Sequence, residues 1–307
     1  MIHSPLRDDI FYLTEAGTET EVMYKHGHQF PHFAMFTLLE DHRAVDDITA
    51  MYRRYLDVMA EAETGAMICG LEYRLSPDWA ALLGHEDQEI VEIQKRCIDL
   101  LQDVSAPYAD SIPHIVIGGS IGPRGDAYGK GGAITADEAE AYHSTQLAAL
   151  KATGADIACA HTFNNIPEAI GIVRAAERIG LPIAVYFSLD GRSRLNSGPT
   201  LREAVETTDT ETRGAAAFYG LNCSHPIEFE PAIDDGAWMS RMRSVRPNAS
   251  KMEKIALCKL GHLEDGDPVE LGEQMGDLHR RFPHMNVLGG CCGTDERHLR
   301  EIARNVL

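Results

Sequence analysis

Short apolar segments recur along this chain at intervals that leave room for a helix between one segment and the next. This alternation of strands and helices is typical of a parallel sheet whose faces are covered by helices. The expected strands are rich in β-branched or apolar residues, as buried parallel strands are. They span residues 11–14, 66–69, 114–118, 156–160, 183–188, 217–222, 242–246 and 286–289.

Helical patterns lie between these segments. In the longest of them, apolar residues recur at helical spacing. Another opens with a capping-box sequence, Thr135 followed by Glu138, and a third is closed by Gly180. The expected helices span residues 44–63, 135–154, 167–179 and 295–304.

About eight strands without a linker-like segment predict a single α/β domain, a (β/α)8 TIM barrel, over residues 1–307. A doubly wound sheet is the alternative architecture, since it shows the same alternation. In a barrel the chemistry lies at the carboxyl ends of the strands. The segments expected there are residues 14–19, 118–132, 222–226 and 289–294.

The charge balance restricts the possible partners. With 28 Lys and Arg against 47 Asp and Glu, the net charge is −19, so the chain is a poor non-specific partner for nucleic acid or an anionic membrane. No segment approaches the roughly 18 apolar residues of a membrane span, and the first residues carry no apolar signal core. We therefore expect a cytoplasmic protein that binds neither nucleic acid nor membranes.

The cysteines carry the strongest chemical signal. There are seven, an odd number that in a reducing compartment indicates free thiols, metal ligands or nucleophiles. Cys291 and Cys292 are adjacent and flanked by glycines, and Cys223 ends another expected strand. Glycine lets the backbone bend so that adjacent cysteines reach one metal ion. Three thiolates suit zinc, and three protein ligands leave the open position of a catalytic site.

Other residues in these segments have ordinary interpretations. The remaining cysteines, Cys69, Cys97, Cys159 and Cys258, are expected to be small buried apolar residues. His225 could approach the metal, but we favour a solvated loop histidine.

Three further features also have structural interpretations. The Gly-x-Ser-x-Gly sequence around Ser120 resembles a hydrolase elbow, but Pro123 and Gly125 follow where that motif requires a helix. The glycine-rich residues 118–132 are expected to form a loop over the barrel mouth. Trp79, five residues after Arg74, could face a cationic donor, but we favour core packing or a helix start.

The sequence Gly-x-Asn-Cys followed by Gly-Gly-Cys-Cys-Gly-Thr resembles the homocysteine S-methyltransferase family. Residues 13–20, 119–125 and 246–249 are similar to its first, third and seventh strand-loop segments, so the resemblance covers nearly the whole chain. It implies a (β/α)8 barrel and methyl transfer to the thiol of homocysteine, giving methionine. It also implies one zinc ion held by the catalytic residues Cys223, Cys291 and Cys292.

Two positions depart from the family's pattern. Glu15 stands where many members have aspartate. His161 stands where many have a glutamate that helps to bind the amino group of homocysteine. Because histidine cannot supply the same fixed negative charge, Glu15 or Glu19 is the expected partner of that ammonium. The residues predicted to bind substrate or order the zinc loop are Glu15, Glu19, His161, Asn222 and Asn248.

These residues predict a zinc-dependent S-methyltransferase whose partners are a small-molecule thiol and a methyl donor. A free alkyl thiol has a pKa of about 8.5, and zinc would supply the reactive thiolate at neutral pH. The donor must carry an activated methyl group: a sulfonium such as S-methylmethionine or S-adenosylmethionine, or betaine.

Three alternatives use the same cysteines. The first is methyl transfer to or from another thiol or a corrinoid partner. The second is a zinc hydrolase, against which three thiolates argue because their charge weakens zinc as a Lewis acid toward water. The third is a zinc or redox sensor.

Overall fold

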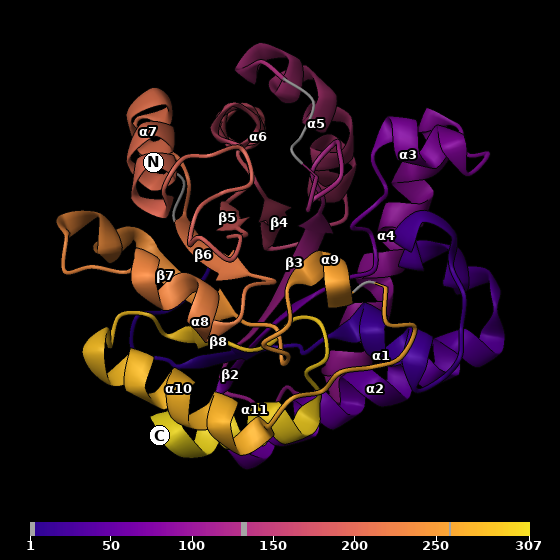
Figure 1. Cartoon of the computed structure of the whole chain (residues 1–307). Coiled ribbons are helices and arrows are strands. Elements are labelled where there is room, and N and C mark those ends of the chain that lie inside the picture. The colour runs from indigo at the N-terminus through magenta and orange to yellow at the C-terminus, as the bar shows by residue number, and fades with distance from the viewer. Residues whose placement is uncertain (1–3, 130–133, 258) are drawn as a thin grey trace.

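The computed structural model describes residues 4–129, 134–257 and 259–307, which form a closed barrel of parallel strands surrounded by helices (Figure 1). Each strand pairs with the next, and the last closes on the first through Tyr12 with Val287 and Leu13 with Leu288. The expected barrel is confirmed, and the open doubly wound sheet is excluded. The strands are β1 (Tyr12–Thr14), β2 (Gly65–Cys69), β3 (Ile115–Ile121), β4 (Ile157–Phe163), β5 (Ile183–Phe187), β6 (Phe218–Asn222), β7 (Met242–Arg246) and β8 (Val287–Leu288).

The four expected helices are present as α2, α5, α6 and α11. Asp41 caps α2, the Thr135–Glu138 capping box opens α5, and Gly180 ends α6 at φ +68°. The α-helices are α1 (Thr18–Tyr24), α2 (His42–Glu61), α3 (Pro77–Leu82), α4 (Asp87–Ser105), α5 (Ala136–Ala152), α6 (Ile166–Ile179), α7 (Leu201–Thr212), α8 (Pro226–Phe229), α9 (Lys254–Leu257), α10 (Pro268–Arg281) and α11 (Glu296–Val306).

None of the described helices is long and apolar enough to cross a membrane. Short 3-10 turns complete the connections between the helices and strands. The turns are η1 (Pro31–Phe33), η2 (Met35–Glu40), η3 (Ala106–Tyr108), η4 (Glu230–Ala232) and η5 (Ala237–Arg241).

The barrel interior contains an apolar cluster in which large and small side chains from most of the strands pack together. This cluster lies beneath the carboxyl ends of the strands, so polar side chains are free to gather above it. Its buried members are Leu6, Tyr12, Met67, Cys69, Val116, Ile157, Cys159, Ala184, Tyr186, Phe218 and Val287.

β3 is longer than the sequence predicted, because Gly118 to Ile121 continue the strand instead of beginning a loop. The glycines there serve close packing. A Cβ on Gly118 would lie 2.9 Å from the Cys69 sulfur, and one on Gly119 would clash with Leu150 of α5. Ser120 is therefore a strand residue, not the nucleophile of a hydrolase elbow. Residues 130–133 of the expected loop lie outside the described residues, as does Cys258.

Candidate active site

A cavity of about 400 Å³ opens at the carboxyl ends of the strands. It is bounded by the ends of β1, β4 and β6, by the segments after β7 and β8, and by parts of the loops after β2 and β3. The structure brings all of the predicted site residues together on its wall: Glu15, Glu19, His161, Asn222, Cys223, Asn248, Cys291 and Cys292.

The three cysteine sulfurs converge on one side of this cavity, within 4.8 Å of one another. The Cys223 and Cys292 sulfurs are 3.9 Å apart. Tetrahedral zinc with bonds of about 2.3 Å separates its sulfur ligands by about 3.8 Å, so the donor set fits that ion. The sulfurs of Cys223 and Cys291 are in disulfide contact, with Cα atoms 5.5 Å apart. Zinc binding therefore requires this pair in its reduced form.

The end of β7 holds the two cysteine segments together. The backbone N–H of Cys223 donates to the carbonyl of Arg246 at 3.1 Å, and that of Cys291 donates to the carbonyl of Pro247 at 2.8 Å. Gly293 follows at φ +83°, where a Cβ would clash with the Glu264 carbonyl. Glycine is therefore required here for the sharp bend that the sequence predicted around the paired cysteines.

Asn222 makes its shortest hydrogen bonds to Thr162 in the same region. Its Oδ1 accepts from the Thr162 N–H and its Nδ2 donates to the Thr162 hydroxyl, both at 2.9 Å, while Nδ2 lies 4.0 Å from the Cys291 sulfur. Thr162 and Cys223 both adopt left-handed backbone conformations, at φ 65° and 51°. Such strain is maintained only where surrounding contacts impose it, and the Asn222 amide supplies two of those contacts.

Arg246, to which the sequence analysis gave no role, is the centre of a buried network beside the cysteines. Its Nη2 lies 2.6 Å from the Glu15 carboxylate, its Nη1 lies 3.0 Å from His161 Nε2, and its Nε donates to the Gly290 carbonyl. His161 Nδ1 lies 2.9 Å from the Ser120 hydroxyl. Burial and the Arg246 charge lower the pKa of His161 well below its ordinary value, so a neutral imidazole accepts from Arg246.

This network changes the expected role of Glu15. Burial raises the pKa of its carboxyl group, and the charge of Arg246 opposes that rise. The carboxylate also accepts from the backbone N–H of Cys69 at 3.0 Å. Glu19 differs, because it is only partly buried, accepts from the Thr18 hydroxyl, and has no cationic partner among the described residues. Of the two acidic candidates, Glu19 is the one with a charge available to a ligand.

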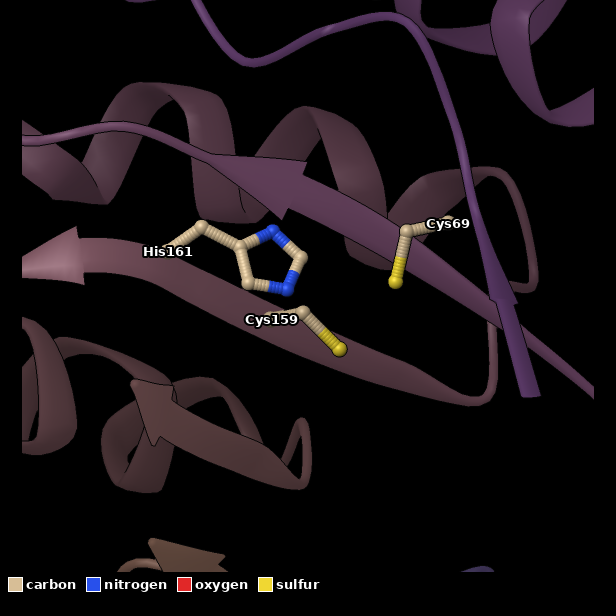
Figure 2. A group of neighbouring side chains, drawn as sticks. All are labelled: Cys69, Cys159 and His161. Carbon is tan, nitrogen blue, oxygen red and sulfur yellow. The ribbon is translucent and has the colours of Figure 1, made fainter. Parts of the chain in front are cut away.

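A second group of metal-binding residue types comes from two neighbouring strands, with Cys69 on β2 and Cys159 and His161 on β4 (Figure 2). The sulfurs of Cys69 and Cys159 and a ring nitrogen of His161 are within 4.8 Å of one another. Both ring nitrogens of His161 already have partners, and one of these is the cationic Arg246. A hydrogen bond with Cys159, together with burial, raises the pKa of Cys69 well above its ordinary value. Cys69 is therefore a protonated core residue, and the burial expected of Cys69, Cys97 and Cys159 is confirmed.

His225 corrects one expectation, since it is buried and not a solvated loop histidine. Its Nδ1 accepts from the Ile227 N–H, so it caps α8, and burial lowers its pKa to about 4. Trp79 lies in the first turn of α3, in agreement with a helix start, and its ring lies over Arg74.

The model of the homocysteine S-methyltransferase family matches residues 13–306. The chain belongs to this family. The resemblance read from the cysteine motifs, and with it the expected S-methyltransferase, is thereby confirmed.

Several relatives and solved structures show how far this similarity extends. Homocysteine S-methyltransferase YbgG of Bacillus subtilis is 26% identical over 233 residues, which cover 68% of this chain and 70% of that protein. Homocysteine S-methyltransferase 2 of Arabidopsis thaliana is 25% identical over 186 residues, 58% of this chain and 53% of that protein. The metallated form of the homocysteine methyltransferase MmuM from Escherichia coli superposes with a TM-score of 0.71 at 17% identity, over 97% of this chain and 96% of that one. The last comparison supports the fold.

Proposed function

We propose that this protein catalyses zinc-dependent transfer of a methyl group from an activated donor to a thiol, with homocysteine as acceptor and methionine as product. The observation that carries the proposal is the set of three cysteine sulfurs within 4.8 Å of one another on the wall of a cavity. Membership of the homocysteine S-methyltransferase family supports the same reaction. A cytoplasmic location is proposed with it, because a reducing compartment keeps the cysteines as thiols.

Each part of the site has a defined task in this reaction. Cys223, Cys291 and Cys292 would hold the ion and leave one coordination position facing the cavity. Zinc, when bound, acts as a Lewis acid that keeps the acceptor thiol deprotonated at neutral pH. The cavity wall aligns the two substrates, so that the thiolate electron pair forms the new bond to the methyl carbon. The bond from that carbon to the donor sulfur or nitrogen breaks in line, and its electron pair leaves with the donor.

The polar lining supports an amino acid as acceptor. Glu19 offers a carboxylate without a cationic partner, and the buried Oδ1 of Asn248 has no hydrogen-bond partner among the described residues. Both are acceptors suited to an ammonium group. In this proposal Glu19 and Asn248 bind the substrate, whereas Glu15 and His161 shape the pocket wall through Arg246.

The cavity lining also supports a cationic methyl donor. Aromatic faces and carboxylates both stabilise a sulfonium or quaternary ammonium group. Apart from Glu15, which is paired with Arg246, the side chains of these two kinds that line the cavity are Tyr24, Phe33, Tyr73 and Tyr128, together with Glu19, Asp126 and Glu264.

Metal content of the reduced protein tests the site directly. We expect about one zinc per chain by mass spectrometry of the metal. Cys223→Ser, Cys291→Ser and Cys292→Ser should each lose most of it, whereas Cys97→Ser, in the buried face of α4, should retain it. Full retention of zinc in Cys291→Ser contradicts the site.

Turnover tests the reaction. The zinc-loaded protein is incubated with homocysteine and, in parallel, with S-methylmethionine, S-adenosylmethionine or betaine, and methionine is detected by mass spectrometry. We expect methionine with at least one donor and none in the Cys291→Ser variant. Zinc-loaded protein that forms no methionine with any of these donors contradicts the proposed reaction.

A further inference from the structure

Three buried cationic side chains line the cavity, and they differ in how their charge is balanced. Arg246 is paired with Glu15 at 2.6 Å, and Lys254 is paired with Glu228 at 3.1 Å. Arg74 is only 8% exposed and forms no ion pair with any carboxylate of the described residues. A buried charge is costly unless it is paired. The described part of the chain supplies no negative charge to compensate the Arg74 guanidinium.

Neutral groups hold the Arg74 side chain in place. Its guanidinium carbon lies 4.8 Å from the centre of the Tyr73 ring and 4.5 Å from that of the Trp79 ring. Its Nη1 donates to the carbonyls of Pro123 and Gly125 at 2.9 and 3.1 Å. These contacts fix the plane of the group, but none of them carries a full negative charge.

The rest of the guanidinium has no hydrogen-bond partner among the described residues. Nε is buried without a hydrogen-bond partner, and Nη2 donates to no atom of the described residues. The N–H bonds of Nε and Nη2 are parallel and match the two oxygens of a carboxylate. A dianionic phosphate suits this cavity less well, because Glu19, Asp126 and Glu264 also line it.

We propose that Arg74 is the site that binds the carboxylate of a substrate. The inference rests on the proposed function, because it takes the acceptor and the donor to be small molecules in this cavity. Homocysteine, S-methylmethionine and betaine each carry a carboxylate, so the group could come from either substrate. A monocarboxylate would place one negative charge against Arg74, the one buried cation on the cavity wall that has no carboxylate partner among the described residues.

Matched substrate pairs distinguish these two sources. The acceptor pair is homocysteine and 3-aminopropane-1-thiol, which lacks only the carboxylate. The donor pair is S-methylmethionine and (3-aminopropyl)dimethylsulfonium. We expect removal of the carboxylate from one of the two substrates to raise its KM in the unmodified enzyme by roughly 10- to 150-fold, as for the loss of a charge-assisted hydrogen bond. The pair that shows the increase identifies the substrate whose carboxylate is bound.

Variants of Arg74 complete the experiment. In Arg74→Met the KM of the carboxylate-bearing substrate should rise by a similar factor, while the KM of its decarboxylated analogue should not change. Arg74→Lys should recover part of the loss and remains informative if Arg74→Met does not fold. Arg192→Met, whose side chain is 77% exposed on another loop, is the control and should change neither pair. The proposal is overturned if Arg74→Met raises KM equally for both members of both pairs, or if it raises KM for none of the four compounds.

Binding separates this inference from the proposed reaction. Calorimetry with the same four compounds on the zinc-loaded protein should show tighter binding of the carboxylate-bearing member of one pair, and Arg74→Met should abolish that difference. If this selectivity is present but no methyl group is transferred, the reaction is contradicted and the Arg74 site stands. If methyl transfer occurs without any carboxylate preference, the Arg74 site is contradicted and the reaction stands.

Discussion

Arg246 shows at the residue scale how one side chain can organise a barrel mouth. It contacts Glu15 after β1, His161 on β4 and Gly290 after β8, and its own carbonyl accepts from Cys223 after β6. These contacts connect the segments that carry Cys223 and Cys291 to the wall of the cavity at the barrel mouth. The Glu15–Arg246 pair is buried at its centre, so breaking it leaves a charge without a partner.

We expect Glu15→Gln to destabilise the fold by about 3–5 kcal/mol, the usual cost of removing one partner of a buried ion pair. Urea unfolding measures the change. Asp9→Asn removes the carboxylate of an exposed pair with Arg7 and should cost less than about 1 kcal/mol. His161→Glu added to Glu15→Gln returns a carboxylate to the neighbourhood of Arg246 and should recover part of the lost stability. A Glu15→Gln variant as stable as the parent would show that the pair contributes little.

Glu72 predicts a pH dependence of stability. Its Oε1 accepts from the Ser120 N–H at 2.9 Å, its Oε2 has no partner among the described residues, and burial raises its pKa from 4.5 to about 8. Between these values the folded chain holds a proton that the unfolded chain has lost. The stabilising contribution is therefore complete below pH 4.5 and is lost as the pH rises to about 8, at about 1.4 kcal/mol per pH unit.

Glu72→Gln cannot titrate and should not show this loss. From about pH 5.5 to about pH 7.5, the unfolding free energy of the variant relative to the parent should rise by about 3 kcal/mol. Urea unfolding of both proteins across this range provides the measurement, and the contributions of other titrating groups cancel in the difference. Parallel pH curves would contradict the assignment.

At the scale of elements, the packing of α6 on α5 depends on Gly171. Alanine normally favours a helix over glycine by up to about 1 kcal/mol. Here a Cβ would lie 2.5 Å from Ala139 Cβ and 2.6 Å from the Glu140 nitrogen on the facing helix. We expect Gly171→Ala to destabilise the protein by about 1–3 kcal/mol, because overpacking outweighs the helix preference. In Gly191→Ala the new methyl group meets no atom within 4 Å, so its denaturation midpoint should barely move.

At the scale of the whole molecule, the net charge of −19 is the dominant electrostatic feature. Repulsion among like charges destabilises a compact state, and salt screens that repulsion. We therefore expect the melting temperature of the zinc-loaded protein to rise as sodium chloride is increased from about 10 mM to about 150 mM, over which the screening length falls from about 30 to 8 Å. A melting temperature that falls over this range would show that attractive ion pairs outweigh the net repulsion.

Patterns along the chain were enough to predict the barrel and the three cysteines of the candidate zinc site. Strand–helix alternation and the Thr135–Glu138 capping box are local patterns, so residues close together in the sequence are sufficient to predict these elements. The paired cysteines, Cys291 and Cys292, are similarly informative, because adjacent thiols between glycines have few structural explanations. Expectations of this kind depend on spacing along the chain, and the structure confirms the barrel and brings the cysteine sulfurs together.

Which charges on the cavity wall have a partner could be seen only in the folded chain. In the sequence, Glu15 and Glu19 are equivalent acidic residues of one strand-end segment. In the structure, Arg246 forms an ion pair with Glu15, from which it is 231 residues distant in sequence, but not with Glu19. Arg74 is one arginine among many until folding buries it between two rings without a carboxylate from the described chain. The energy of a charge depends on its burial and on partners distant in sequence, and both arise only when the strands close into a barrel.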